Sequence, residues 1–321
     1  MARGTVYLVG AGPGNPGLLT IRGRQVLRLA DVVFYDGLVG RGVLRLIPRR
    51  TRKLRVAKGP RHRGRFPQAR INQLLVMEAE AGRQVVRLKG GDAFLFSRGG
   101  EEAETLRKRG IRFEVVPGVT SALAGPAFAG IPLTERQYAS SVAIATGRES
   151  GSPLHRAVNW AGLARSADTL VILMGVATLS RVARQLLDGG LPPDTPVAAV
   201  QWATTPRQRT LLFTLGEANG NSLRTRLRSP CVLVVGPTVV LAHRLNWNPR
   251  ETRWASARFV RVAKRTEEAN RISPGISSGH RRSHHSRSGR IAAPAEERDP
   301  TERASRPGQV RERRAGTRNP C

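Results

Sequence analysis

The segment from Val6 to Thr20, which reads VYLVGAGPGNPGLLT, constrains the fold of this chain more than any other. A short apolar run ends in a loop dense in glycine and proline, and a helical pattern follows. A strand that leads through a glycine loop into a helix is how an α/β domain brings bare backbone against a small ligand. We therefore expect an α/β fold with a ligand at the end of this strand.

The same loop carries the spacing G-x-G-x-x-G at Gly12, Gly14 and Gly17, which is typical of dinucleotide-binding proteins. Pro13 and Pro16, however, stand where a phosphate cradle needs N–H groups, and proline has none. The loop therefore favours close, shape-selective contact over anion capture. One argument keeps a nicotinamide-dependent dehydrogenase as an alternative, because Asp36 follows about 20 residues on, where such enzymes bind a ribose.

Strand and helix patterns alternate along the chain and predict a largely parallel, doubly wound sheet in its first third. After a short linker, 131–134, the strands are short and predict a mixed sheet. We expect two α/β domains, 1–131 and 132–245, with a ligand cleft between them. The expected strands are 6–9, 31–35, 84–88, 111–116, 140–146, 168–174, 197–201, 210–215 and 231–235, and the expected helices are 18–29, 70–81, 101–109 and 179–187.

From about Asn246 the periodicity fails, and residues 246–321 are predicted to form a basic, disordered tail. The net charge of +31 does not come from this tail alone, since residues 250–321 contribute +10 and residues 1–249 contribute +21. A nucleic acid or a polycarboxylate ligand would suit such a charge, and so would simple arginine-rich composition. Without a recognition helix, zinc spacing or basic strand with interleaved aromatics, we expect no specific nucleic-acid binding.

The cysteine count and hydropathy predict the setting of the protein. Cys231 and Cys321 are the only cysteines, so we expect no disulfide framework and no metal site, in keeping with a reducing cytoplasm. No apolar run approaches the ~18–20 residues of a membrane span. Because the first residues lead directly into a strand, no signal peptide is expected.

Two carboxylates follow expected strands, at the edge where open α/β sheets bind ligands. Asp36 stands in Tyr35-Asp36-Gly37, and Asp92 in Lys89-Gly90-Gly91-Asp92. For Asp36, starting the next turn or capping a helix is an equally good interpretation. Glu101 and Glu102 open a helix, which a favourable helix dipole explains without further function.

Eight motifs in order resemble the uroporphyrinogen-III C-methyltransferases, a family of the tetrapyrrole methylase superfamily, over residues 5–240. They are Gly10-Ala11-Gly12-Pro13-Gly14, Tyr35-Asp36-x-Leu38-Val39, Lys89-Gly90-Gly91-Asp92, Arg98-Gly99-Gly100-Glu101-Glu102, Val116-Pro117-Gly118, Gly130-Ile131-Pro132-Leu133-Thr134, Met174-Gly175 and Thr204-Thr205-Pro206-x-Gln208-Arg209.

This resemblance implies a cytoplasmic homodimer that transfers methyl groups from S-adenosylmethionine to C2 and C7 of uroporphyrinogen III, giving precorrin-2 for sirohaem or cobalamin. Asp36 takes the place of the family's general base, and Lys58 that of an acid or substrate anchor. The implied donor contacts are Pro13, Gly90, Gly91, Asp92, Leu95, Thr120, Ser121, Met174 and Ala203. Candidates for the eight substrate carboxylates are Arg22, Arg61, Arg63, Arg65 and Arg136.

The chain departs from the family pattern at three places, and these affect the substrate side more than the donor side. Ala93 replaces the proline that usually follows Gly-Gly-Asp, the segment 59–68 looks longer than usual, and Ala203 replaces a glycine. A methylase of a later corrin precursor stays open as an alternative, although the motifs Tyr35-Asp36-x-Leu38-Val39 and Arg98-Gly99-Gly100-Glu101-Glu102 favour the earlier enzyme.

Overall fold

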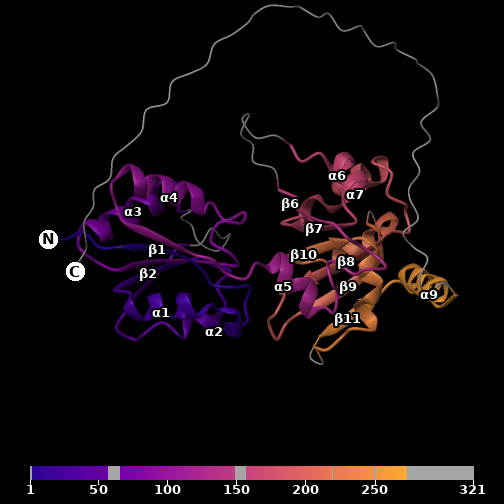
Figure 1. Ribbon diagram of the computed structural model, residues 1–321, viewed down its shortest axis with the longest axis horizontal. Coiled ribbons are helices and arrows are strands. Elements are labelled where there is room, and N and C mark those ends of the chain that lie inside the picture. Colours follow the sequence, from indigo (N-terminus) through magenta and orange to yellow (C-terminus); the bar gives the residue numbers. More distant parts are fainter. Residues whose placement is uncertain (1, 57–65, 149–156, 219, 249–250, 273–321) are drawn as a thin grey trace, which may run out of the picture. The chain divides into compact units, whose positions relative to one another are not determined.

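The computed structural model describes residues 2–56, 66–148, 157–218, 220–248 and 251–272, which form two sheets with helices packed on them (Figure 1). This confirms the mixed α/β fold. Among the described residues, no helix is both long and apolar enough to cross a membrane.

The first sheet contains five parallel strands in the order β3-β2-β4-β1-β5. Helices α3 and α4 cover one face, and α1 and α2 the other (Figure 1), so the sheet is doubly wound as predicted. The bounds are β1 Val6–Gly10, α1 Ile21–Leu29, β2 Val32–Tyr35, α2 Arg41–Leu44, β3 Arg52–Arg55, α3 Gln68–Glu80, β4 Val85–Lys89, α4 Gly99–Lys108 and β5 Phe113–Val116.

The second sheet contains six strands in the order β11-β9-β8-β10-β7-β6 and is mixed, as predicted, because β8 and β10 run antiparallel to their neighbours. The bounds are α5 Ser121–Phe128, β6 Val142–Thr146, α6 Trp160–Ser166, β7 Thr169–Leu173, α7 Leu179–Asp188, β8 Pro196–Gln201, β9 Arg209–Thr214, α8 Asn221–Arg226, β10 Cys231–Val235, β11 Thr252–Ala255 and α9 Ala257–Ile272.

Helix α5 packs on the second sheet although its residues precede the predicted boundary at residue 131. Ala122, Ala129 and Ile131 belong to the apolar cluster that contains Val200 and Val232 of that sheet. Small residues let this helix approach closely, since a Cβ added to Gly125 would lie 3.4 Å from the side chain of Val232. By packing, the division between the two sheets therefore falls between β5 and α5.

The prediction of a disordered tail over 246–321 is wrong for residues 252–272. Strand β11 pairs in parallel with β9, and α9 follows it. Phe259 and Ala263 on α9 are four residues apart, so they share one helix face and are buried in the same cluster as Val239 and Leu241. This apolar face escapes notice because arginine, lysine and glutamate dominate the helix. Residues 273–321 lie outside the described part.

We predict that Phe259→Ala lowers the free energy of unfolding by about 3–5 kcal/mol, because it empties a buried site. The matched control is Val260→Ala on the same helix. Val260 is 41% exposed, so its truncation should change stability by about 0.5 kcal/mol or less. Chemical denaturation of both variants measures the difference. Equal, small effects would mean that α9 does not contribute to the folded core.

Candidate functional site

Three glycine-containing loops meet at the carboxyl edge of the first sheet. Gly12 and Gly91 exchange backbone hydrogen bonds of 3.0 and 2.9 Å. A Cβ added to Gly10 would lie 2.6 Å from the Cα of Gly118, and one added to Gly118 would lie 2.5 Å from the carbonyl oxygen of Gly91. These positions therefore exclude any side chain, and the loops present backbone at the strand ends.

Asp92 holds these loops together. Its Oδ1 accepts hydrogen bonds from the N–H groups of Phe94 and Leu95, at 2.7 and 2.9 Å, and its Oδ2 accepts one from Gly118 at 2.9 Å. Burial by itself would raise the pKa of Asp92, but the N–H donors, Gly118 foremost, outweigh it and lower the pKa. The carboxylate thus fixes the loop after β4 against the loop after β5.

Four of the predicted donor contacts, Gly90, Gly91, Thr120 and Ser121, lie around these loops. A Cβ added to Gly91 would lie 3.9 Å from both the N of Ser121 and the Cα of Thr120, in ordinary contact rather than overlap. Thr120 caps α5 by accepting a hydrogen bond from the N–H of Ala122 at 3.3 Å. Gly90, Gly91, Thr120 and Ser121 are all half-buried, so this backbone remains partly accessible.

On the second sheet, the predicted contacts Met174 and Ala203 follow β7 and β8, which run in the same direction and end at one edge. Met174 is 47% exposed and has a left-handed backbone, φ +56°. Ala203 stands between two further left-handed residues, Trp202 at φ +46° and Thr204 at φ +65°. Strained backbone of this kind clusters at functional sites.

The glycine loop after β1 is joined to the loop after β8. The N–H of Asn15 donates to Oγ1 of Thr204 at 3.1 Å, and a Cβ added to Gly14 would lie 2.6 Å from Cγ2 of Thr205. Pro13 and Ala203, predicted to contact the same ligand from opposite halves of the sequence, therefore belong to loops in direct contact.

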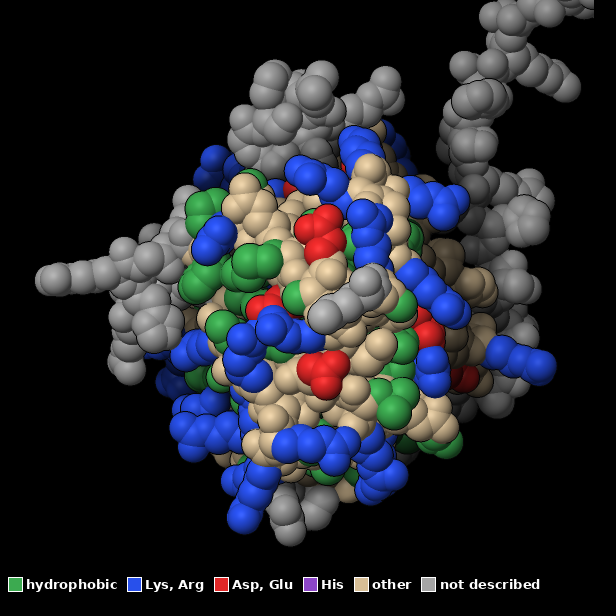
Figure 2. Space-filling view, turned by 90° about the vertical axis from the view of Figure 1, so that its left-hand side faces the viewer, with side chains coloured by type: hydrophobic (Ala, Val, Ile, Leu, Met, Phe, Trp, Pro, Cys, Tyr) green, Lys and Arg blue, Asp and Glu red, His purple; other side chains and the backbone are tan. Residues whose placement is uncertain are grey.

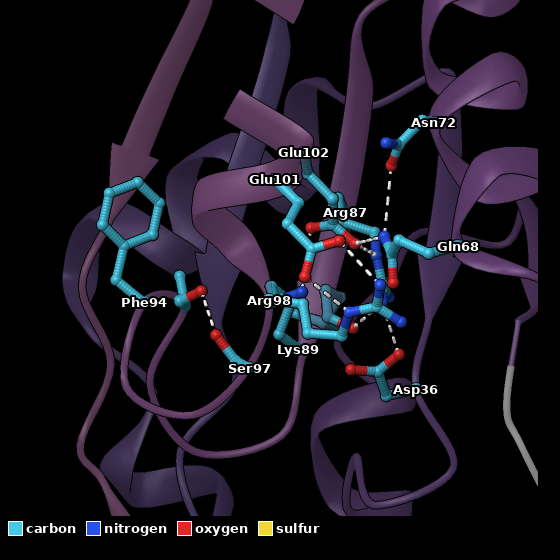
Figure 3. A network of polar contacts seen from close by, with 12 residues as sticks. Asp36, Gln68, Asn72, Arg87, Lys89, Phe94, Ser97, Arg98, Glu101 and Glu102 are labelled. Carbon is cyan, nitrogen blue, oxygen red and sulfur yellow. Dashed lines mark hydrogen bonds and ion pairs between the residues drawn. The ribbon is translucent and has the colours of Figure 1, made fainter. Parts of the chain in front are cut away.

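Asp36 follows β2 and is paired with a buried arginine (Figure 3). Nη2 of Arg87 donates to Oδ1 of Asp36 at 2.6 Å, and the Asp36 side chain keeps 31% of its surface exposed. Its backbone N–H donates to the carbonyl of Leu88 on β4. Asp36 is thus an accessible carboxylate with a fixed orientation.

Arg87 also contacts Glu102, which lies at the centre of a buried polar cluster (Figure 3). Glu102 accepts from Nε of Arg87 at 2.9 Å, from Nζ of Lys89 at 2.8 Å and from Nε2 of Gln68 at 2.9 Å. The side chains of Glu102 and Lys89 are fully buried, and that of Arg87 is 3% exposed. A favourable helix dipole, which the sequence suggests as the explanation for Glu101 and Glu102, therefore does not account for the position of Glu102.

The cluster balances two cations against two carboxylates. Burial alone would raise the pKa of Glu102, but the charges of Arg87 and Lys89 outweigh it and lower the pKa. Burial lowers the pKa of Lys89, and the charge of Arg87 lowers it further. For Arg87, burial also acts downward, but Asp36 and Glu102 dominate and raise its pKa. The cluster thus favours an ionised Glu102 beside a charged Arg87, which in turn orients Asp36.

Sequence patterns did not single out Arg87 and gave Glu102 no function. A usable signal is the run Val85-Val86-Arg87-Leu88-Lys89, which places one cation within the expected strand 84–88 and a second directly after it. Buried cations require a nearby carboxylate. The sequence did not reveal which carboxylate, because Glu101 and Glu102 are adjacent and only the helix phase separates them.

Of the predicted substrate arginines, the structure describes Arg22 and Arg136. Arg22 makes two hydrogen bonds to Glu114 of β5, at 2.7 and 2.6 Å, and Glu114 pairs with Tyr7, in the amino half of the sheet. Arg22 also lowers the pKa of Glu114. Arg136 is exposed on a turn of the second half. Lys58, Arg61, Arg63 and Arg65 lie outside the described residues.

Comparison with known proteins shows which family this chain resembles. The sequence profile of the Tetrapyrrole (Corrin/Porphyrin) Methylases matches residues 5–219. The chain is 48% identical over 247 residues to a siroheme synthase of Chromobacterium violaceum. The aligned segment is 77% of this chain but 52% of that protein. The chain thus spans about half the length of the siroheme synthases it matches.

Shorter relatives are covered almost completely. A uroporphyrinogen-III C-methyltransferase of Synechocystis is 44% identical over 74% of this chain and 89% of its own length. A crystal structure of the uroporphyrin-III C-methyltransferase from Thermus thermophilus, complexed with S-adenyl homocysteine, superimposes with a TM-score of 0.63 at 40% identity, over 74% of this chain and 99% of that one.

We predict that Glu102→Gln lowers the free energy of unfolding at pH 7 by about 3–5 kcal/mol, because Arg87 and Lys89 lose their buried counter-charge. The control is Glu101→Gln. Glu101 pairs with Arg98 at the surface and is 53% exposed, so its loss should cost at most about 1 kcal/mol. Urea denaturation measures both.

The same pair of variants has an expected pH dependence. Since the folded-state pKa of Glu102 is lowered, its contribution to stability is present above the unfolded-state pKa of about 4.3 and is lost as the pH falls from there through the folded pKa. The stability of the wild type should therefore decline more steeply below pH 5 than that of Glu102→Gln. Parallel profiles for the two proteins would contradict this assignment.

Proposed function

The chain belongs to the family of tetrapyrrole (corrin/porphyrin) methylases, and on that premise we propose that it methylates uroporphyrinogen III at C2 and C7 with S-adenosylmethionine, giving precorrin-2. The observation that best supports this proposal is the meeting of the glycine loops at Gly10, Gly91 and Gly118, beside an oriented carboxylate at Asp36.

The bare backbone around Gly90 and Gly91 fits the methyl donor. With no Cβ at Gly91, space remains between the loop after β4 and the start of α5. We infer that Pro13, Gly90, Gly91 and Leu95 contact the donor from the loops of the first sheet. Thr120 and Ser121 contact it from the start of α5, and Met174 and Ala203 from the loops of the second sheet. Asp92 then acts on the donor indirectly, by fixing the loops through Gly118.

The donor supplies an activated methyl group on sulfonium sulfur. The carbon–sulfur bond breaks as a carbon–carbon bond forms at the ring, and the reaction is balanced when the substrate loses a proton. The protein's contribution is alignment of the two carbons, exclusion of water and uptake of that proton. We assign proton uptake to Asp36, because its carboxylate is accessible and Arg87 fixes its direction. Lys58 is proposed as the acid or substrate anchor.

The positive charge of the protein suits a substrate with eight carboxylates. Lys and Arg outnumber Asp and Glu on the face shown in Figure 2. Positive surface potential speeds the encounter with an anionic ligand. We assign Arg136, Arg61, Arg63 and Arg65 to this task. Arg22 is a weaker candidate, since its guanidinium already has a carboxylate partner in Glu114.

The nicotinamide alternative is weakened at the glycine loop. The N–H of Asn15, in the middle of that loop, donates to Oγ1 of Thr204 and is not available to a pyrophosphate. Pro13 and Pro16 have no N–H to offer. A methylase of a later corrin precursor remains the competing proposal within the family.

Incubation with uroporphyrinogen III and S-adenosylmethionine labelled in the methyl group tests the proposal. We expect two labelled methyl groups per tetrapyrrole and precorrin-2 as the product. Absence of label from uroporphyrinogen III, with transfer to a later precursor, would favour the competing proposal. Binding of NADH without binding of S-adenosylhomocysteine would refute both.

We also propose a cytoplasmic homodimer, as the resemblance implies. Cys231, a buried free thiol whose pKa burial raises, suits a reducing compartment. Light scattering coupled to gel filtration tests the assembly. A mass of about twice 35.0 kDa is expected, and a mass of one chain would refute the dimer.

We predict that Asp36→Asn lowers turnover by roughly 100-fold or more, because it removes the proton acceptor while keeping size and most hydrogen bonding. Calorimetry should show little change in the affinity for S-adenosylhomocysteine. Asp31→Asn is the control, since Asp31 accepts a backbone hydrogen bond at the amino end of the same strand. Lost cofactor binding with normal turnover at saturation would reverse the assignment.

We predict the opposite pattern for Asp92→Ala. The three backbone N–H groups that donate to Asp92 lose their acceptor, so the loops around Gly91 and Gly118 loosen. Calorimetry should show an affinity for S-adenosylhomocysteine weakened by about 1–3 kcal/mol. Turnover at saturating donor should stay close to that of the wild type. An unchanged affinity in a folded variant would mean that Asp92 does not position the donor loops.

A further inference from the structure

Glu251 lies beyond the region that the family profile matches, yet its side chain is fully buried. It accepts hydrogen bonds from Nε2 of Gln208 at 2.7 Å, from Nε of Arg253 at 2.5 Å and from the hydroxyl of Thr210. Arg253 in turn donates to the carbonyls of Ala129 and Ala242. A residue just before β11 is thus built into the second sheet.

The carboxylate of Glu251 fixes the orientation of the Gln208 amide. A carboxylate only accepts, so the amide group of Gln208 must direct its NH₂ toward Glu251. The same nitrogen donates to the carbonyl of Phe128 at 3.0 Å. The amide oxygen therefore faces the other way, where it accepts from the N–H of Thr204 at 2.7 Å. Gln208 is 2% exposed, so water does not compete for these bonds.

The turn that Gln208 holds is strained. Trp202 and Thr204 both have a left-handed backbone conformation, which residues other than glycine rarely adopt. The turn is held at its start by the hydrogen bond from the N–H of Trp202 to Pro230, at 3.0 Å. The bond from Thr204 to Gln208 holds its other end, and Oγ1 of Thr204 then accepts from Asn15 of the glycine loop.

We propose that Glu251 is a positioning residue for the donor-side turn Trp202–Thr205 and acts through Gln208. This inference rests on the proposed function in one respect, namely that Ala203 contacts the methyl donor. It assigns a role in the site to a segment outside the region that defines the family. The hydrogen-bonded path runs from Glu251 through Gln208 and Thr204 to Asn15.

Two measurements on Glu251→Ala and Gln208→Leu test the proposal. Without ligand, amide hydrogen exchange at Thr204 should accelerate by about tenfold or more, because its acceptor is lost or free to rotate. With ligand, the dissociation constant of S-adenosylhomocysteine should rise by about tenfold, while turnover at saturating donor changes little. Glu251→Gln keeps an acceptor oxygen toward Gln208 and should give a smaller change in both.

Asp194→Ala is the matched control. Asp194 pairs with Arg258 of α9 at 2.6 Å, and both side chains are more than 40% exposed. This variant loosens the same C-terminal segment without touching Gln208. Exchange at Thr204 and affinity for S-adenosylhomocysteine should both match those of the wild type.

A folded Glu251→Ala protein with unchanged exchange and unchanged affinity would overturn the proposal, even with a lowered melting temperature. Should Glu251→Ala fail to fold, Gln208→Leu and Glu251→Gln decide by the same two readouts. Accelerated exchange in variants of a protein that binds no S-adenosylhomocysteine would refute the proposed function but leave the coupling of Glu251 to the turn intact.

Discussion

The burial of two cations in the central strand β4 is the constraint on which the first half of the structure depends. Arg87 and Lys89 alternate with apolar residues, so both point to the same face of the sheet, toward α3 and α4. Burying such charges is costly unless a carboxylate pairs with them, and Glu102 of α4 meets both. The 13-residue separation of Lys89 and Glu102 then closes the loop between them, which contains Gly90, Gly91 and Asp92. The pairing of buried charges in the core thus fixes the geometry of the loop that follows β4.

A second constraint, steric rather than electrostatic, completes that edge. The ends of β1, β4 and β5 approach until Gly10 and Gly118 contact each other and the carbonyl oxygen of Gly91, which leaves no room for a Cβ at Gly10 or Gly118. Asp92 adds an acceptor for the N–H of Gly118, so separating the loops breaks this partly buried hydrogen bond. Backbone, rather than long side chains, therefore forms this surface, and a ligand can approach it closely.

Sequence patterns predicted the elements that bury a regular apolar face. Strand β10 begins and ends where expected, at Cys231 and Val235, because every residue of it is apolar and buried. Strand β3 has the sequence Arg-Lys-Leu-Arg and shows no such pattern, since it forms an exposed edge. Helix α5 is absent from the expected helices, because its alanine and glycine residues give little periodicity. Helix α9 was missed because two buried residues, Phe259 and Ala263, hold it to the core among many charges.

The candidate site also has features that the sequence shows locally and features that depend on partners distant in the chain. Glycine spacing and the strand-end carboxylates are local features, so the sequence alone singles out Asp36, Gly91 and Asp92 as candidates. The partners that define their roles come from elsewhere in the chain. Arg87 is 51 residues from Asp36, Gly118 is 26 from Asp92, and Glu251 is 43 from Gln208.

The residue type alone does not reveal whether an aspartate accepts hydrogen bonds from backbone N–H groups or takes up a proton. What separates Asp36 from Asp92 is that three N–H groups occupy the oxygens of Asp92, whereas Arg87 contacts Oδ1 of Asp36 and leaves a third of that side chain exposed. The roles that we propose, proton uptake for Asp36 and loop positioning for Asp92, therefore rest on how their oxygens are used, which only the folded chain determines.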